Sequence, residues 1–288
     1  MRVARAVEEL ERRDRAVAIG TFDGVHLGHK DVIGAALESG LVPTLVTFDP
    51  HPRAVLGYRV ELLTTLERRL ELIGELGVEE ALVVNFTPEL SQLSAREFVD
   101  RTLTPMGTRI VVAGEDFRFG HRRAGDLDLL ESLGFEVRRV QLVEDVSSGR
   151  VRQLLSEGAV ARAAHLLGRP AEVEGTVVAG DARGGTLGFP TANLAVPADL
   201  LVPAYGIYAG AAAGHRAAVS IGTNPHYHGQ ECRVEAFLLD FEGDLYGQRL
   251  LVELWQRLRE ERAFASEEEL VEQIGRDVEE TRAATRPR

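Results

Sequence analysis

The chain is poor in cysteine, in lysine and in long apolar runs. Cys232 is the single cysteine among 288 residues, which excludes an internal disulfide framework. Lys30 is the only lysine, so arginine supplies nearly all of the 33 basic residues, and we attach no function to this skew. No stretch approaches the roughly 18 consecutive apolar residues that cross a bilayer. The charged segment 1–15 lacks the apolar core of a secretory signal, and we expect a cytoplasmic protein without a membrane partner.

The bulk composition is that of a globular protein, with 44% hydrophobic and 27% charged residues. A net charge of −12 argues against a general nucleic-acid binder, because such proteins need a basic footprint to displace counterions. Single hydrophobic cores stop growing beyond about 250–300 residues, so two domains are expected.

In the first half of the chain, short apolar runs alternate with helical patterns. In segment 64–77, three apolar residues share one helix face, and Thr64 with Glu67 fits a capping box. Ser94 with Glu97 repeats that signature. Continuously apolar strands between helices predict an α/β, Rossmann-like domain with a parallel sheet, whose ligands bind beyond the carboxyl ends of the strands. The expected strands are Ala16–Gly20, Thr44–Phe48, Ala81–Phe86, Arg109–Ala113 and Val137–Val143.

The pattern changes near Gly168, after two short helices expected in segment 150–167. Closely spaced strands separated by glycine turns predict a small antiparallel β-barrel, with hairpins at Ala213–His215 and Glu242–Asp244. Ser266 caps a terminal helix whose Leu270, Ile274 and Val278 would pack on the barrel. The predicted domains are 1–168 and 169–288. The expected barrel strands are Glu172–Ala179, Ile207–Ala213, Ala217–Ile221, Arg233–Leu239 and Arg249–Leu258.

A glycine- and histidine-rich segment, Ile19–His29, follows the first predicted strand and opens a helix. Its glycines let backbone N–H groups approach phosphates, and the helix N-terminus adds partial positive charge there. His26 and His29 can donate hydrogen bonds to phosphate oxygens as charge builds up during in-line displacement. A plain βα turn with two exposed histidines is the alternative, and a zinc site lacks a third ligand nearby.

The spacing His26-Leu27-Gly28-His29 resembles the signature of a nucleotidyltransferase superfamily. With segments 47–52, 114–120 and 146–148, the first half is similar to the N-terminal half of the bacterial bifunctional riboflavin kinase/FAD synthetase family. The resemblance implies catalytic roles for His26 and His29. The ATP- and phosphate-binding residues that it implies in this half are Gly20, Asp23, Gly28, Asp116, Ser147, Ser148 and Arg152. From the residues alone, Asp49 and Asp116 are turn or helix-cap residues.

Gly149 departs from this family, which usually has a threonine after the two serines. Glycine keeps the backbone N–H but loses a hydroxyl donor, and a hydrogen bond to a charged group contributes about 1.5–3 kcal/mol. We therefore expect a slower adenylyl step.

A second glycine-rich segment, Gly180–Asn193, follows the first barrel strand. It lacks the Lys-Ser/Thr ending of a Walker loop, and on its own it is an ordinary surface turn. Its ending, Gly188-Phe189-Pro190-Thr191-Ala192-Asn193, resembles the riboflavin kinase signature. That resemblance implies ATP contacts from Gly180, Gly188, Thr191 and Asn193, with Thr191 and Asn193 holding Mg²⁺, which prefers hard oxygen ligands.

Segments 220–225 and 234–241 continue the resemblance, and the family's general base corresponds to Glu235. A carboxylate that interrupts an apolar strand needs a reason, although simple alternation toward solvent is the alternative. As a base, Glu235 would take the proton of the ribityl 5′-hydroxyl that attacks the γ-phosphorus of ATP. Arg259 is either a flavin contact or a solvated arginine. His226 and His228 with Cys232 form a minor alternative metal site.

The resemblance extends from about Val17 to Val278 and implies a bifunctional transferase. The C-terminal barrel would convert riboflavin and ATP to FMN and ADP, and the N-terminal domain FMN and ATP to FAD and pyrophosphate. Both steps would need Mg²⁺, with ATP, riboflavin, FMN and FAD as the small-molecule partners. Two alternatives stay open: a riboflavin kinase that has lost adenylylation, and a non-enzymatic flavin or nucleotide sensor.

Overall fold

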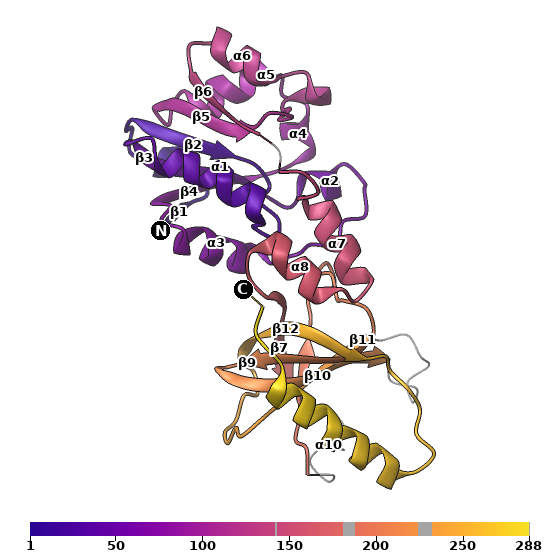
Figure 1. Ribbon diagram of the computed structural model, residues 1–288. Helices are drawn as coiled ribbons and strands as arrows, with labels where there is room; N and C mark the ends of the chain where they lie inside the picture. The colour runs from indigo at the N-terminus through magenta and orange to yellow at the C-terminus, as the bar shows by residue number, and fades with distance from the viewer. Residues whose placement is uncertain (142, 181–187, 224–231, 288) are drawn as a thin grey trace. The chain divides into compact units, whose positions relative to one another are not determined.

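The structure is a computed structural model that describes residues 1–141, 143–180, 188–223 and 232–287 (Figure 1). The chain divides into two compact units, residues 1–147 and 148–288. The middle of the second glycine-rich segment and the metal site considered at His226 and His228 lie outside the described residues. Among the residues that the structure describes, none of the helices has the length and apolar character needed to cross a membrane.

The N-terminal unit alternates strands and helices, as expected. In chain order its elements are β1 (Arg2–Ala4), η1 (Val7–Glu9), β2 (Arg15–Ile19), α1 (Leu27–Leu37), β3 (Val42–Asp49), α2 (Pro52–Val55), α3 (Leu66–Glu75), β4 (Glu80–Asn85), α4 (Pro88–Ser91), α5 (Ala95–Phe98), η2 (Val99–Leu103), β5 (Thr108–Gly114), η3 (His121–Arg123), α6 (Leu127–Ser132) and β6 (Glu136–Val140).

The strands form one parallel sheet in the order β1-β4-β3-β2-β5-β6. Alternate side chains of each strand enter separate cores on the two faces. Val17 and Ile19 of β2 pack with α5, η2 and α6, whereas Ala16 and Ala18 pack with α1 and α3. Helices therefore cover both faces, and the predicted Rossmann-like architecture is confirmed (Figure 1).

Of two capping boxes predicted from the sequence, one is present and the other is displaced. Ser94 and Glu97 form the predicted capping box, with both reciprocal hydrogen bonds present. For α3 the prediction was wrong by one residue, because Thr65 is the N-cap and accepts from the Arg68 N–H. Thr64 instead accepts from the Gly24 N–H at 3.2 Å, which ties it to the loop after β2.

The C-terminal unit begins with two helices and continues as a barrel. Its elements are α7 (Ser148–Ser156), α8 (Val160–Leu167), β7 (Ala171–Val178), β8 (Ala192–Ala195), β9 (Gly206–Ala212), β10 (His215–Thr223), β11 (Cys232–Leu238), β12 (Arg249–Arg259) and α10 (Glu267–Ala283). The helices α7 and α8 group with this unit, and the predicted domain boundary at residue 168 stays a prediction.

The strands close into an antiparallel barrel in the order β10-β11-β8-β7-β12-β9. The predicted hairpin at Ala213–His215 joins the paired strands β9 and β10. The hairpin predicted at Glu242–Asp244 is wrong, since β11 pairs with β10 and β8 while β12 pairs with β7 and β9. In the closed barrel, β8 and β7 lie between β11 and β12.

The terminal helix α10 is attached through polar residues as well as apolar ones. Val278 is buried, whereas Leu270 and Ile274 are only half-buried. The other buried residues of this helix are Gln273, Asp277 and Thr281.

Candidate functional sites

The parallel sheet has a topological switch point at β2. The next strand in the chain, β3, pairs on one side of β2, whereas β5 pairs on the other. The loops that leave the carboxyl ends of β2 and β5 therefore diverge, and ligands of such sheets bind in the crevice between them. The His26–His29 motif follows β2, and Asp116 lies in the exposed turn after β5. The two segments that the sequence singled out thus flank this switch point.

The loop after β2 has an unusual backbone. Phe22 and Val25 have φ angles of 51° and 42°, a left-handed conformation that side chains rarely adopt, yet both are buried. Gly24 has a φ of 85°, and a Cβ there would lie 2.6 Å from Leu63, so only glycine fits. Strained backbone of this kind is concentrated at ligand-binding sites, where packing around the loop holds it in place.

His26 and His29 stack face to face at the start of α1. Their ring centroids are 3.6 Å apart, and the rings are inclined by 18°. His26 is the N-cap, and its Nδ1 accepts the His29 backbone N–H at 3.3 Å. Because Nδ1 is an acceptor, the proton of a neutral His26 ring is on Nε2, which leaves that nitrogen as a donor.

The His29 ring is held neutral by its surroundings. Burial lowers its pKa well below the usual 6.5, and His26 and the positive charge of Arg69 lower it further. Its Nδ1 is buried without a hydrogen-bond partner among the described residues. The ring of Phe22 lies edge-on to it at 5.3 Å. The histidine pair is therefore fixed in place by stacking, and the neutral His29 ring still has unused hydrogen-bonding capacity.

Asp23 is fully buried and anchors the loop. Its carboxylate accepts from the backbone N–H of Leu63 at 2.9 Å and of Thr64 at 3.2 Å. The Arg69 Nη2 lies 3.9 Å from the same carboxylate. The predicted contact of Asp23 with ATP stays a prediction, and the structure adds a role in joining the loop to the start of α3.

The other predicted nucleotide contacts belong to several segments of the chain. A Cβ at Gly28 would lie 3.5 Å from His26 and 4.0 Å from Val146, so segment 146–147 reaches the start of α1. Ser147 ends the N-terminal unit, and Ser148 begins α7, with Gly149 and Arg152 in its first turns.

Gly20 directly follows β2, and its Cα faces the Phe22 ring. Asp49 is half-exposed at the end of β3 and lies 3.7 Å from Arg5.

Sequence reasoning missed Arg69. This arginine is on α3, has an exposed fraction of 2%, and approaches Asp23 in the middle of the site. In the sequence it is one charged residue in a helix rich in charge, and only the fold distinguishes it from its neighbour Arg68.

In the barrel, strand register brings the predicted kinase residues together. Glu235 of β11 pairs directly with Asn193 of β8, and on its other side with Ser220 of β10. Directly paired residues project to the same face, with Cβ atoms about 4.5–5.5 Å apart. Val234 and Ala236 face the barrel core, so Glu235 and Asn193 share the outer face.

The segment before β8 is fixed to that same face. The rings of Phe189 and Phe237 meet edge-on at 5.4 Å, and Phe237 lies two residues after Glu235. A Cβ at Gly180 would lie 2.7 Å from Oδ1 of Asn193 and closer still to its Nδ2, so the amide occupies the space beside this glycine. Gly180 and Asn193 are thus held close to Glu235, and Thr191 comes two residues before Asn193 in the chain. Gly188, with a φ of 85°, turns the chain into this segment.

Arg259 forms an internal ion pair. Its Nε donates to Asp277 at 3.0 Å, and its Nη2 donates to the same carboxylate at 2.7 Å. Gln273 donates to Asp277 at 2.8 Å, and Arg262 donates to Gln273 at 2.7 Å. This network fastens α10 to the end of β12, and the flavin contact of Arg259 stays a prediction.

The hard-oxygen groups on the outer face of β8 and β11 suit Mg²⁺. Asn193 offers an amide oxygen on the strand paired with Glu235, and Thr191, just before β8, offers a hydroxyl. Across the described parts of the chain, three or more His, Cys, Asp or Glu side chains do not gather into a metal cage.

Comparison with known proteins matches both units to families. A model of FAD synthetase matches residues 8–152, and a model of riboflavin kinase matches residues 167–285. The bifunctional riboflavin kinase/FMN adenylyltransferase of Listeria monocytogenes is 37% identical over 94% of this chain and 92% of its own length. The enzyme of the same name from Bacillus subtilis is 36% identical over the same shares.

One solved structure is similar over nearly the whole chain. It is a crystal structure from Streptococcus pneumoniae, described as a macrolide-efflux protein, with a TM-score of 0.88 and 32% identity, covering 97% of this chain and 98% of that one. The presence of both domains favours a bifunctional enzyme over a kinase alone. The chain belongs to the family of bifunctional riboflavin kinase/FMN adenylyltransferases.

Proposed function

We propose that the barrel phosphorylates riboflavin to FMN and that the α/β unit adenylylates FMN to FAD, with ATP as the second substrate of both steps. The observation that carries the kinase assignment is the direct pairing of Glu235 with Asn193 beside Gly180. The stacked pair of His26 and His29 at the switch point carries the adenylyl assignment.

In the kinase step, Glu235 accepts the proton of the ribityl 5′-hydroxyl as that oxygen attacks the γ-phosphorus of ATP. A carboxylate on a barrel strand is fixed in direction, so it contributes positioning as well as basicity. Thr191 and Asn193 would hold Mg²⁺ and the phosphates, and the chemistry that Mg²⁺ would supply there is neutralisation of phosphate charge. Gly188 and Gly180 give the phosphates close access to the backbone.

In the adenylyl step, the phosphate oxygen of FMN attacks the α-phosphorus of ATP, and pyrophosphate leaves. His26 Nε2–H donates to the phosphate oxygens, and His29 supplies a second hydrogen bond while staying neutral. Gly20, Gly28 and the N-terminus of α1 add backbone N–H groups and partial positive charge. Because these donors are held in place before the reaction, they stabilise developing charge without reorganising.

The remaining proposed contacts come from other segments. Ser147, Ser148 and Arg152 bind phosphate from the start of α7, and Asp116 contacts the nucleotide from the turn after β5. The Mg²⁺ requirement, the domain boundary at residue 168 and the cytoplasmic location stay predictions.

Product analysis tests this proposal. The purified chain is incubated with riboflavin, ATP and Mg²⁺, and FMN and FAD are separated by chromatography over time. The expected result is FMN followed by FAD. FMN without FAD would leave a riboflavin kinase, and binding of flavin and ATP without any product would leave a sensor.

A further inference from the structure

Arg69 carries a buried charge that its neighbours only partly compensate. Its exposed fraction is 2%, and the one ion pair that it makes within the described residues, with Asp23, spans 3.9 Å. The Asp23 carboxylate already accepts from two backbone N–H groups, at 2.9 Å and 3.2 Å, so it is shared with other donors. Burying a charge without close partners is costly, which makes a purely structural role an incomplete explanation.

The guanidinium also has unused donors. Its Nη2 donates to the Thr64 carbonyl at 3.5 Å, but its Nε and Nη1 are buried without a hydrogen-bond partner among the residues that the structure describes. Guanidinium has five N–H donors and no acceptor, so an anion is the complementary partner. Buried donors left unpaired in a native structure call for a ligand or water to complete them.

The same place holds a second unsatisfied group. The Nδ1 of His29 is likewise buried without a partner in the described part of the chain, and Arg69 is near enough for its charge to lower the pKa of His29. The stacked histidines and the N-terminus of α1 make this the anion-binding end of the site. A phosphate group beside His29 would satisfy the unused donors of Arg69.

We propose that Arg69 is a phosphate-binding residue of the N-terminal site, with its Nε and Nη1 held for the β- and γ-phosphates of ATP and for the pyrophosphate that leaves. The inference rests on the proposed adenylyl transfer. It differs from the interactions described above because it assigns a ligand to a side chain outside both sequence motifs. Arg69 thus adds a fixed positive charge beside the neutral His29 ring.

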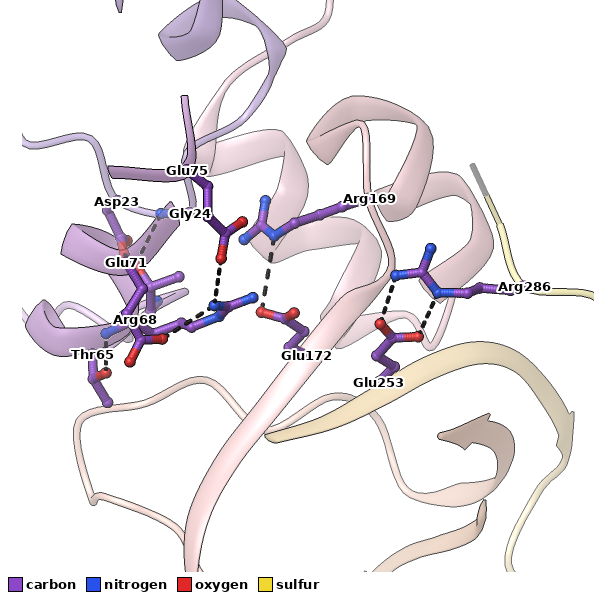
Figure 2. A network of polar contacts seen from close by, with 11 residues as sticks. Asp23, Gly24, Thr65, Arg68, Glu71, Glu75, Arg169, Glu172, Glu253 and Arg286 are labelled. Atoms are coloured by element: carbon purple, nitrogen blue, oxygen red, sulfur yellow. Dashed lines mark hydrogen bonds and ion pairs between the residues drawn. The ribbon is translucent and has the colours of Figure 1, made fainter. Parts of the chain in front are cut away.

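The test measures binding of inorganic pyrophosphate, with Mg²⁺ present, to the full chain by isothermal titration calorimetry. We compare wild type with Arg69→Gln, Arg69→Lys and the matched control Arg68→Gln. Arg68 is the adjacent residue of α3, but its guanidinium lies 3.1 Å from Glu71 and 3.5 Å from Glu75 (Figure 2). Binding elsewhere in the chain is common to all four proteins and cancels in the comparison.

We expect Arg69→Gln to weaken pyrophosphate binding by about 10- to 100-fold, as for the loss of charge-assisted hydrogen bonds. Arg69→Lys keeps the charge but loses the fork of N–H groups, so about a tenfold loss is expected. Arg68→Gln should bind as wild type does. Calorimetry gives stoichiometry and affinity separately, so a merely structural role would lower the bound fraction and leave the dissociation constant unchanged.

Wild-type affinity in Arg69→Gln, or in Arg69→Lys where the glutamine variant does not fold, would overturn the inference. Absence of pyrophosphate binding by the wild type would also overturn it. A separate assay tests the proposed function: if wild-type protein supplied with FMN and ATP forms no FAD, the proposed adenylyl transfer fails.

Discussion

Replacing Gly180 with alanine tests how the kinase site is assembled. The added Cβ would lie 2.7 Å from Oδ1 of Asn193 and closer still to Nδ2, whereas real Cβ atoms essentially never approach other atoms within 3.0 Å. The backbone of Asn193 is fixed by its pairing with Val178 on one side and Glu235 on the other. The amide must therefore turn away from its place beside Glu235.

The magnitude follows from what the amide is proposed to do. A hydrogen bond or ligand contact to a charged group contributes about 1.5–3 kcal/mol, which corresponds to a loss of about 10- to 150-fold in rate. Asn193→Ala should cost a similar factor. Because both changes remove the same interaction, the double variant should be little worse than either single one.

The assay is the initial rate of FMN formation from riboflavin and ATP, with conversion of FMN to FAD measured on the same preparation. Gly275→Ala is the matched control, since a Cβ at that position of α10 meets nothing within 4 Å. The single tryptophan, Trp255, is buried in the C-terminal unit, and its fluorescence reports whether the barrel is folded. Wild-type kinase activity in Gly180→Ala would refute the reasoning, as would additive losses in the double variant.

Two further predictions concern stability. Asp277→Ala leaves Arg259 without its bidentate partner, and breaking such a buried pair should lower the free energy of unfolding by about 3–5 kcal/mol. Urea denaturation followed through tryptophan fluorescence measures this change. The control Asp240→Ala breaks an exposed pair with Arg282 and should change the free energy of unfolding little, so equal losses in the two variants would contradict the account. The lowered pKa of His29 keeps the folded ring neutral below pH 6.5, where the histidine of the unfolded chain binds a proton. The free energy of unfolding of the wild type should therefore fall relative to that of His29→Gln as the pH falls below 6.5, by at most about 1.4 kcal/mol per pH unit. Denaturation followed by circular dichroism measures this, and a difference independent of pH would refute it.

The sequence predicted the layers of both units because apolar periodicity is a local signal. The run 81–84 is apolar throughout and lies in the largely buried strand β4 of the parallel sheet. Two strands, β1 and β8, were not predicted from the sequence. Arg2–Ala4 of β1 is short and largely exposed, and Ala192–Ala195 of β8 is four residues within a motif read as a loop, so neither has a run long enough to show a period. Their pairing is set by neighbouring strands.

The sites were predictable where the chemistry is contiguous in sequence. The two histidines belong to one helical turn, so their spacing already implied that they meet. Arg69 was not predictable, because Arg68 and Arg69 are equivalent until the packing of α3 buries Arg69 fully and leaves Arg68 only partly buried, paired with Glu71. The same holds for Asp277, whose partner Arg259 is 18 residues away in sequence. Long-range pairing decided these roles.

The most direct test of the central claim, two separate sites in one chain, is a reciprocal pair of variants assayed for both products. Glu235→Gln should reduce FMN formation severely, by 100-fold or more on the order expected for loss of a general base, while conversion of FMN to FAD continues at the wild-type rate. His29→Ala should reduce FAD formation and leave FMN formation intact. If either change reduced both activities equally in a folded protein, the assignment of one reaction to each unit would be contradicted.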